Sequence, residues 1–186
     1  MIEYEKKYII SKEECLQIFK ILQEKSSLKK VLQINYYYDT YDFDLYKRNE
    51  TLRIRQIEDN LKVEHKYAKE YIEGVRRCKE ACETIATVPM GLMGDGFNSY
   101  YTYKGNMVTE RYNFDMQDVL ISLDCNYYLG VRDFELEIEL KEEKNRIEFW
   151  ENILKIGNYE NHIGKYTRFV KQYARCYGDS KEITNL

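Results

Sequence analysis

Charged and apolar residues alternate strictly along several short segments, and this alternation limits what the chain can fold into. The clearest case is the run FELEIEL at residues 134–140. Successive side chains of an extended strand point to opposite faces of a sheet. The three glutamates of this run would therefore share one face, and its apolar side chains the other. The first strand, residues 1–8, repeats the pattern, with Glu3, Glu5 and Lys7 on one face.

Further segments carry the same period, so we expect roughly eight strands joined by tight turns in an antiparallel sheet. The other expected strands cover residues 33–39, 52–57, 61–67, 75–85, 107–115 and 119–124. Residues 89–106 are rich in glycine and hold the lone proline. We interpret that stretch as a connection with a short helix.

Three amphipathic segments are predicted to be helices that cover the apolar face of the sheet. The first begins at Ser11, where Glu14 three residues later completes a capping box. The other two span residues 145–156 and 165–177, each with apolar side chains at helical spacing.

Length and composition limit the number of domains, the partners and the compartment that we expect for this protein. A length of 186 residues suits a single domain, residues 1–186, with room for a sizeable core. The net charge of −3, from 29 basic and 32 acidic residues, argues against nucleic acid as a partner. An odd number of cysteines, five, is typical of reduced thiols, so we expect a cytoplasmic protein. No apolar run approaches the roughly 20 residues that span a bilayer, so no membrane partner is expected.

Two architectures satisfy the alternation. An open sheet would show its charged face to water, whereas a closed barrel would turn that face into a lumen. The face is dominated by Arg, Lys and Glu, and three glutamates at roughly 7 Å spacing repel one another unless cations intervene. We therefore favour the α+β class, with a closed eight-stranded antiparallel β-barrel, a charged lumen and helices packed outside. A bound polyanion with divalent cations would neutralise such a lumen.

Five segments occur in a specific order along the chain. They are residues 3–7 (EYEKK), 35–40 (NYYYDT), 52–55 (LRIR), 134–139 (FELEIE) and 165–168 (KYTR). Together they resemble the E-x-E-x-K, N-x-Y-F-D-T, L-R-I-R, Y-E-I-E-x-E and K-S-K-Y-x-R motifs of the CYTH superfamily, the triphosphate tunnel metalloenzymes.

This resemblance implies an eight-stranded tunnel that binds a triphosphate together with Mg²⁺ or Mn²⁺. By position, the residues that would hold phosphate are Lys7, Arg53, Arg55, Lys66, Arg77, Arg111, Lys165 and Arg168. Those that would hold the metal are Glu3, Glu5, Asp124, Glu135, Glu137 and Glu139. Lys165 and Glu5 would take part directly in catalysis.

Two segments depart from the family pattern. Where the family often has R-x-E-x-E, no glutamate stands two residues after Arg77. The role of Arg77 and the choice between Glu80 and Glu83 are therefore open. Near the C-terminus, only Lys165 is present of the family's paired lysines.

The leading functional hypothesis is an enzyme, a metal-dependent triphosphatase that releases orthophosphate. It would be similar to inorganic triphosphatases and thiamine triphosphatases. Inorganic tripolyphosphate is the preferred substrate, because no base-reading or thiamine-reading motif is evident, and nucleoside or thiamine triphosphate is the alternative. Three rivals stand beside it: a class IV adenylate cyclase that releases pyrophosphate, a non-catalytic polyphosphate- or nucleotide-binding module, and an open sheet without a ligand. A homodimer is left open.

Overall fold

The computed structural model describes residues 2–72, 75–93, 100–141, 147–156 and 163–178. Its strands are β1 (Ile2–Ile10), β2 (Leu28–Asp39), β3 (Thr51–Ile57), β4 (Asn60–Ile72), β5 (Val75–Ile85), β6 (Gly91–Met93), β7 (Tyr100–Asp115), β8 (Val119–Tyr128) and β9 (Val131–Leu140). Its helices are α1 (Lys12–Gln23), α2 (Asp44–Lys47), α3 (Ile147–Leu154) and α4 (Lys165–Tyr177).

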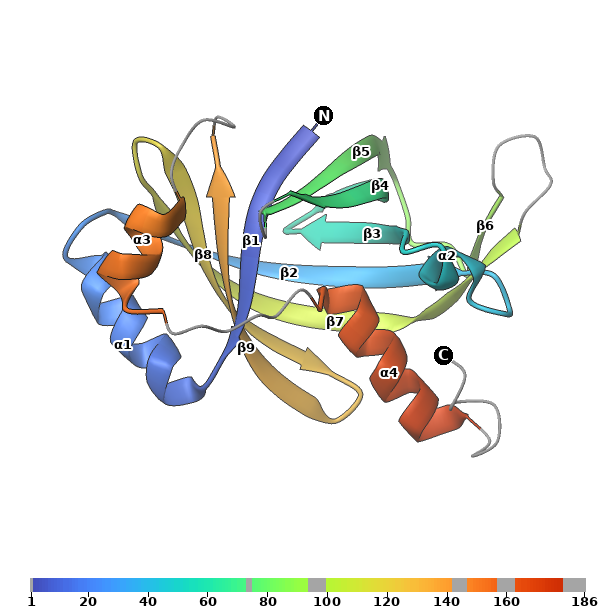
Figure 1. Ribbon diagram of the computed structural model, residues 1–186. Coiled ribbons are helices and arrows are strands. Elements are labelled where there is room, and N and C mark those ends of the chain that lie inside the picture. The colour runs from blue at the N-terminus through green and yellow to red at the C-terminus, as the bar shows by residue number, and fades with distance from the viewer. Residues whose placement is uncertain (1, 73–74, 94–99, 142–146, 157–162, 179–186) are drawn as a thin grey trace.

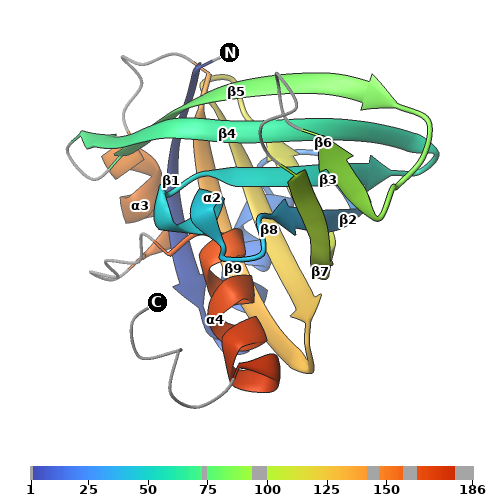
Figure 2. The same cartoon turned by 90° about the vertical axis from the view of Figure 1, so that its right-hand side faces the viewer.

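Eight of the strands close into a barrel because each pairs with a neighbour on both sides. The order around the ring is β1, β9, β8, β7, β2, β3, β4 and β5, and the pairing of β5 with β1 completes it. All of these pairings are antiparallel. The short β6 pairs alongside the first residues of β7, Tyr100 to Thr102 (Figures 1 and 2).

The register keeps the charged residues on the inner face of the barrel. Side chains of directly paired residues lie on the same face of a sheet. Lys7 of β1 pairs with Glu137 of β9, and Glu137 pairs in turn with Ser122 of β8. On the next pair of strands, Asp124 is opposite Arg111 of β7. The closed barrel with a charged lumen is therefore confirmed, and the open sheet is excluded.

Helices α1 and α3 cover one flank of the barrel, as Figure 1 shows. The capping box predicted at Ser11 is present: its hydroxyl accepts from the Glu14 backbone, and the Glu14 side chain accepts from Ser11 N. From α1, Leu22 packs into a cluster that also holds Trp150 of α3 and Ile138 of β9. Full burial of each such apolar side chain contributes roughly 1.5–3 kcal/mol, and this stabilisation fixes the outward parity of β1, β7, β8 and β9.

Helix α4 lies against one end of the barrel (Figure 2), and its aromatic side chains contact inner-face residues there. Tyr37 of β2 shares the inner face because it pairs with Arg53 of β3. The rings of Tyr166 and Phe169, both from α4, each lie 4.9 Å from the Tyr37 ring, centroid to centroid. These aromatic rings close that end of the barrel with apolar contacts, and Met107 and Val170 join the same cluster.

One connection was predicted incorrectly. We expected residues 89–106 to form a loop with a short helix, but β6 occupies Gly91–Met93 and β7 already begins at Tyr100. One of the glycines that suggested a loop, Gly105, lies inside β7 at an irregularity of the β2–β7 pairing. Its φ of +143° and the nearby Phe169 ring explain why glycine is needed there.

All five cysteines are free thiols in the structure, as the sequence led us to expect. Among the described residues, no helix combines the length and the apolar character that a membrane-spanning segment needs.

Candidate active site

Three buried carboxylates meet on the inner face of β8 and β9. Asp124, Glu135 and Glu137 each offer an oxygen, and these oxygens all lie within 4.8 Å of one another. Asp124 and Glu135 are fully buried, and Glu137 is 7% exposed. Lys165, the first residue of α4, extends between them, with Nζ 2.7 Å from an oxygen of each carboxylate. We refer to Asp124, Glu135 and Glu137 as the acidic triad.

Two more cations, one from β7 and one from β1, contact the acidic triad. Arg111 donates two hydrogen bonds to Asp124, at 2.8 and 2.6 Å, and a third to Glu137. Lys7 Nζ lies 2.5 Å from Glu137 and 2.8 Å from Glu5, which is itself buried. The triad and its cations thus form one ionic network at the centre of the barrel.

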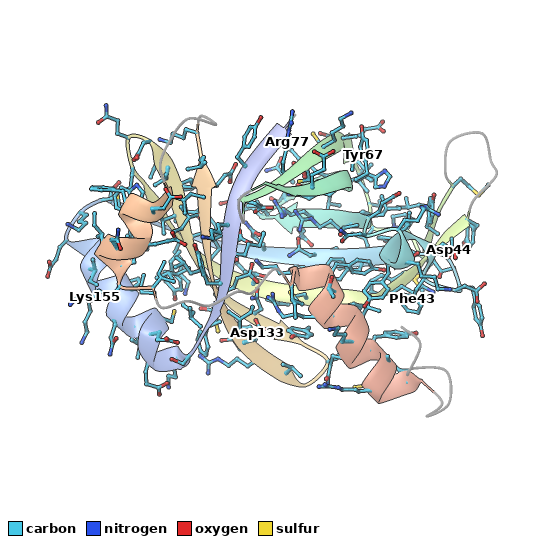
Figure 3. The ribbon with its side chains drawn as sticks, viewed as in Figure 1. Phe43, Asp44, Tyr67, Arg77, Asp133 and Lys155 are labelled. Carbon is cyan, nitrogen blue, oxygen red and sulfur yellow. The ribbon has the colours of Figure 1, made fainter. Side chains whose placement is uncertain are left out.

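Arg168 joins the same network from the second turn of α4. Its guanidinium donates to Glu135 and, at 2.9 Å, to Asp133. Figure 3 labels Asp133 where β8 and β9 approach α4. Asp133 was not singled out from the sequence, although it shares the parity of Glu135 two residues later.

The protonation states follow from burial and from these cations. Burial alone raises the pKa of Asp124, but Arg111 and Lys165 outweigh it and hold that pKa below its usual value. Burial likewise opposes ionisation of Glu137, yet Arg111, Lys165 and Lys7 place its pKa well below the ordinary range. For Glu135, burial dominates and raises the pKa. The surrounding cations thus favour ionisation of Asp124 and Glu137, whereas burial opposes it at Glu135.

The opposite wall of the barrel carries arginines. Strand β3 lies four places from β9 around the ring, so Arg53 and Arg55 face the acidic triad across the lumen. Arg53 Nε donates to Glu64 of β4 at 2.8 Å, and its Nη2 is 2.7 Å from the same oxygen without a well-aligned hydrogen bond. Arg55 Nε donates to Asn35 at 3.2 Å, and Arg55 Nη1 is 3.5 Å from Glu64. Two arginines thus share a single carboxylate.

We refer to Arg53 and Arg55, with Asn35 beside them, as the arginine wall, and this wall could bind an anion. Burial, and then the charge of Arg53, lower the pKa of Arg55 to about 10. Asn35 is 1% exposed, and its Nδ2 has no hydrogen-bond partner among the described residues. Its orientation is fixed because Oδ1 accepts from Arg55. A buried donor without a partner is costly. An anion on this wall would therefore stabilise both the Asn35 amide nitrogen and the Arg55 guanidinium.

Two further predicted residues lie on the inner face. Lys66 of β4 is 8% exposed, and its Nζ is 3.8 Å from Glu80 of β5. Glu139 pairs with Glu5 across β9 and β1. Glu3 pairs through its backbone with Cys78, but its side chain lies outside the described part of the chain.

Arg77 does not belong to this site, which corrects the prediction that it binds substrate. It pairs with Tyr4, whose parity is opposite to that of Glu5. Its guanidinium carbon lies 5.8 Å from the centroid of the Tyr4 ring. Both parities of β5 carry charges, so the sequence alone could not decide which of them faces inward. The register shows that Glu80, rather than Glu83, is the inward glutamate, and that Arg76 is paired opposite Glu5.

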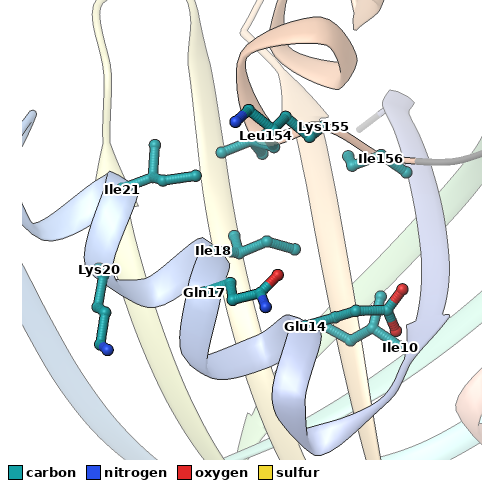
Figure 4. Close-up of a pocket in the computed structure, with 9 residues that line it drawn as sticks. All are labelled: Ile10, Glu14, Gln17, Ile18, Lys20, Ile21, Leu154, Lys155 and Ile156. Atoms are coloured by element: carbon teal, nitrogen blue, oxygen red, sulfur yellow. The ribbon is translucent and has the colours of Figure 1, made fainter.

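A second hollow, outside the barrel, is a weaker candidate. It lies between α1 and the end of α3, has a volume of about 350 Å³, and is lined mainly by aliphatic side chains such as Ile18 and Leu154 (Figure 4). Its one carboxylate, Glu14, is already used in the capping box. The inner face of the barrel therefore remains the site with reactive chemistry.

Comparisons with known proteins agree with the fold. A family model described as the CYTH domain matches residues 1–165. A search of curated proteins found no match.

Solved structures share the fold over most of the chain. A proposed adenylate cyclase from Bacillus halodurans is 25% identical, with a TM-score of 0.72 over 90% of this chain and 96% of its own. A proposed adenylyl cyclase from Hippeastrum, described as having a dominant triphosphatase activity, is 20% identical, with a TM-score of 0.71 over 90% of this chain and 95% of its own. The Mimivirus capping enzyme triphosphatase is 13% identical, with a TM-score of 0.56 over 83% of this chain and 89% of its own.

Proposed function

The chain belongs to the CYTH domain family, and on that premise we propose that it hydrolyses a triphosphate with the help of a bound divalent cation. The observation that carries this proposal is the pairing of two opposite walls inside one closed barrel. One wall holds the acidic triad, and the other holds Arg53, Arg55 and the Asn35 amide nitrogen, for which the described part of the chain offers no hydrogen-bond partner.

The donor set of the acidic wall fits a hard divalent cation. Carboxylate oxygens are the preferred protein ligands of Mg²⁺ and Mn²⁺, and the oxygens of the triad lie within 4.8 Å of one another. The residues that would hold the ion are Asp124, Glu135 and Glu137, with Glu5 and Glu139 next to them on the inner face. When bound, such an ion neutralises phosphate oxygens and lowers the pKa of a coordinated water.

The chain's own cations would bind and orient the substrate. Guanidinium groups match phosphate oxygens with two parallel hydrogen bonds. Arg53 and Arg55 would hold one part of the phosphate chain, and Lys66 extends the same wall. Lys7, Arg111 and Lys165 would reach the part nearest to the acidic triad. Positioning and charge neutralisation of this kind supply most of the rate in phosphoryl transfer.

In the proposed reaction, water attacks the terminal phosphorus and the bond from that phosphorus to the bridging oxygen breaks. The bridging oxygen leaves as part of the shortened phosphate chain, and the water oxygen ends in orthophosphate. Inorganic tripolyphosphate is the proposed substrate, because the inner-face contacts described above are made by ionic groups suited to phosphate. The aromatic rings that close the barrel at α4 pack against each other, so they give no support for an organic group on the substrate.

One incubation series tests this proposal. The protein is mixed with tripolyphosphate, ATP or thiamine triphosphate, each with Mg²⁺ or Mn²⁺, and the products are identified by ion chromatography. Release of orthophosphate that depends on the metal supports hydrolysis. Pyrophosphate together with cyclic AMP would instead support a cyclase, the activity proposed for the neighbour from Bacillus halodurans. Binding of one of these triphosphates without any turnover would support a non-catalytic binding module.

A further inference from the structure

The ammonium of Lys165 lies where a cation bound by the acidic triad would lie. Its Nζ is 2.7 Å from oxygens of all three carboxylates, and the residue is only 8% exposed. Within the described ranges, these three residues are the one acidic group compact enough to hold a metal ion. A metal ion and the ammonium therefore compete for the same oxygens.

The balance of charge makes this competition strong. Four cations contact the network, and they are Lys7, Arg111, Lys165 and Arg168. The carboxylates that they contact are Glu5, Asp124, Asp133, Glu135 and Glu137. An added divalent cation would lie within a few ångströms of Lys165 and Arg111, where like charges repel strongly because the site is buried.

The geometry of α4 lets the ammonium move while its backbone stays fixed. Tyr166, the next residue, donates a 2.6 Å hydrogen bond to Asp39, and its ring packs on Tyr37. These contacts hold the start of α4 against the barrel. The side chain of lysine is a flexible four-carbon stem with a mobile charge, so Nζ can leave the triad without undocking the helix.

We propose that Lys165 is an internal counterion, which fills the acidic triad when no ligand is bound and is exchanged for a divalent cation when a triphosphate arrives. The displaced ammonium then pairs with an oxygen of the terminal phosphate. This inference rests on the metal site of the proposed function. It has a distinct consequence: a metal ion alone binds weakly, because Lys165 excludes it until an anion accepts the ammonium.

The test measures binding of Mn²⁺ in the absence of any phosphate. Free Mn²⁺ is followed by electron paramagnetic resonance for the wild-type protein and for three variants, Lys165→Gln, Lys165→Arg and Lys7→Gln. Lys165→Gln removes the competing charge, so we expect Mn²⁺ to bind at least about tenfold more tightly than to the wild type. Lys165→Arg keeps the charge on a planar group that forms paired bonds to carboxylates, so we expect weaker binding than to the wild type.

Lys7→Gln is the matched control for net charge. It removes one cation from the same network, but Lys7 has no contact with Asp124 among its ion pairs. The proposal expects a smaller gain in affinity for this variant than for Lys165→Gln. An equal gain in both would overturn it, because the effect would then be one of net charge alone.

Two further outcomes also decide the matter. Loss of Lys165 leaves buried carboxylates with fewer partners, and such a variant can fail to fold. In that case the comparison of Lys165→Arg with the wild type decides, and equal or tighter binding to Lys165→Arg overturns the proposal. Absence of Mn²⁺ binding in every protein also overturns it, whereas the product assay judges the triphosphatase proposal separately.

Discussion

The phenol of Tyr166 donates a 2.6 Å hydrogen bond to the fully buried carboxylate of Asp39. That carboxylate also accepts from the backbone of Thr40 at 2.8 Å, of Leu45 at 2.9 Å and of Tyr46 at 3.0 Å. One side chain at the end of β2 therefore holds both α2 and α4. Because Lys165 precedes Tyr166, the same bond fixes the base from which Lys165 reaches the acidic triad.

Replacing Tyr166 with phenylalanine should loosen this attachment. A hydrogen bond to a charged group contributes about 1.5–3 kcal/mol, and for a domain of this size each kcal/mol shifts Tm by roughly 2–4 °C. We expect a fall in Tm of several degrees, measured by circular dichroism. Tyr173→Phe is the control on the same helix. The ring of Tyr173 packs on Phe43 and Phe169, and the substitution should keep this packing. Equal losses in the two variants would contradict the role given to Asp39.

Gly105 should not tolerate even a methyl group. An added Cβ would lie 2.7 Å from Cζ of Phe169, and φ is +143°. We expect Gly105→Ala to lower the free energy of unfolding by about 1–3 kcal/mol, as overpacked cores do. Gly130→Ala is the control: it also has a positive φ, +76°, but nothing lies within 4 Å of the added atom. Urea unfolding should show a smaller loss for Gly130→Ala, and the reverse order would refute the close contact between β7 and α4.

The arginine wall should control substrate affinity. We expect Arg53→Ala and Arg55→Ala each to raise KM for tripolyphosphate about tenfold or more, because each removes charge-assisted hydrogen bonds to phosphate. Arg77→Ala is the matched control, since Arg77 lies over Tyr4 on the outer face. Steady-state kinetics should show no change for it. An unaltered KM and kcat in Arg53→Ala would remove that residue from the site.

Glu5 should be essential for turnover. It is 5% exposed on the inner face, pairs with Glu139 across the strands and contacts Lys7 at 2.8 Å. We expect Glu5→Gln to reduce metal-dependent phosphate release by about 100-fold or more. Glu13→Gln, an exposed change in the first turn of α1, should leave the rate unchanged. A normal rate in Glu5→Gln would count against its assignment to the metal site.

Acid should weaken the fold partly through Asp124. Although burial opposes its ionisation, Arg111 and Lys165 lower its pKa in the folded protein. A lowered pKa contributes stability that is present above the unfolded value of about 4 and is lost as the pH falls through the folded value. Glu137 acts in the same direction, and Glu135, whose pKa is raised, acts in the opposite one.

We therefore expect Asp124→Asn to be less stable at neutral pH and to lose less stability than the wild type between about pH 5 and pH 3. Urea unfolding at several pH values measures both effects. Asp115→Asn serves as the control, because its pair with Lys141 is at the surface and should matter little. An acid dependence unchanged by Asp124→Asn would show that the network does not control acid stability.

The chain order of charged and apolar residues was enough to predict the barrel and most of the site. The period of two along residues 134–140 placed three glutamates on one face, and their mutual repulsion favoured a closed sheet with internal cations over an open sheet. The helix that begins after Ser11 could also be predicted, because the two residues of its capping box, Ser11 and Glu14, lie within one turn of each other. Local patterns of this kind depend on the geometry of one short segment, and both are present in the structure.

Contacts between distant segments were decided only by the tertiary structure. Both parities of β5 are charged, so only its register with Tyr4 excluded Arg77 and brought Glu80 inward. Gly105 was mistaken for a loop residue because its partner, Phe169, lies 64 positions later in the sequence. The sequence named the ionic residues because alternation reports which face they share. The folded barrel alone determined which of them pair, because register and helix docking depend on packing between segments far apart in the chain.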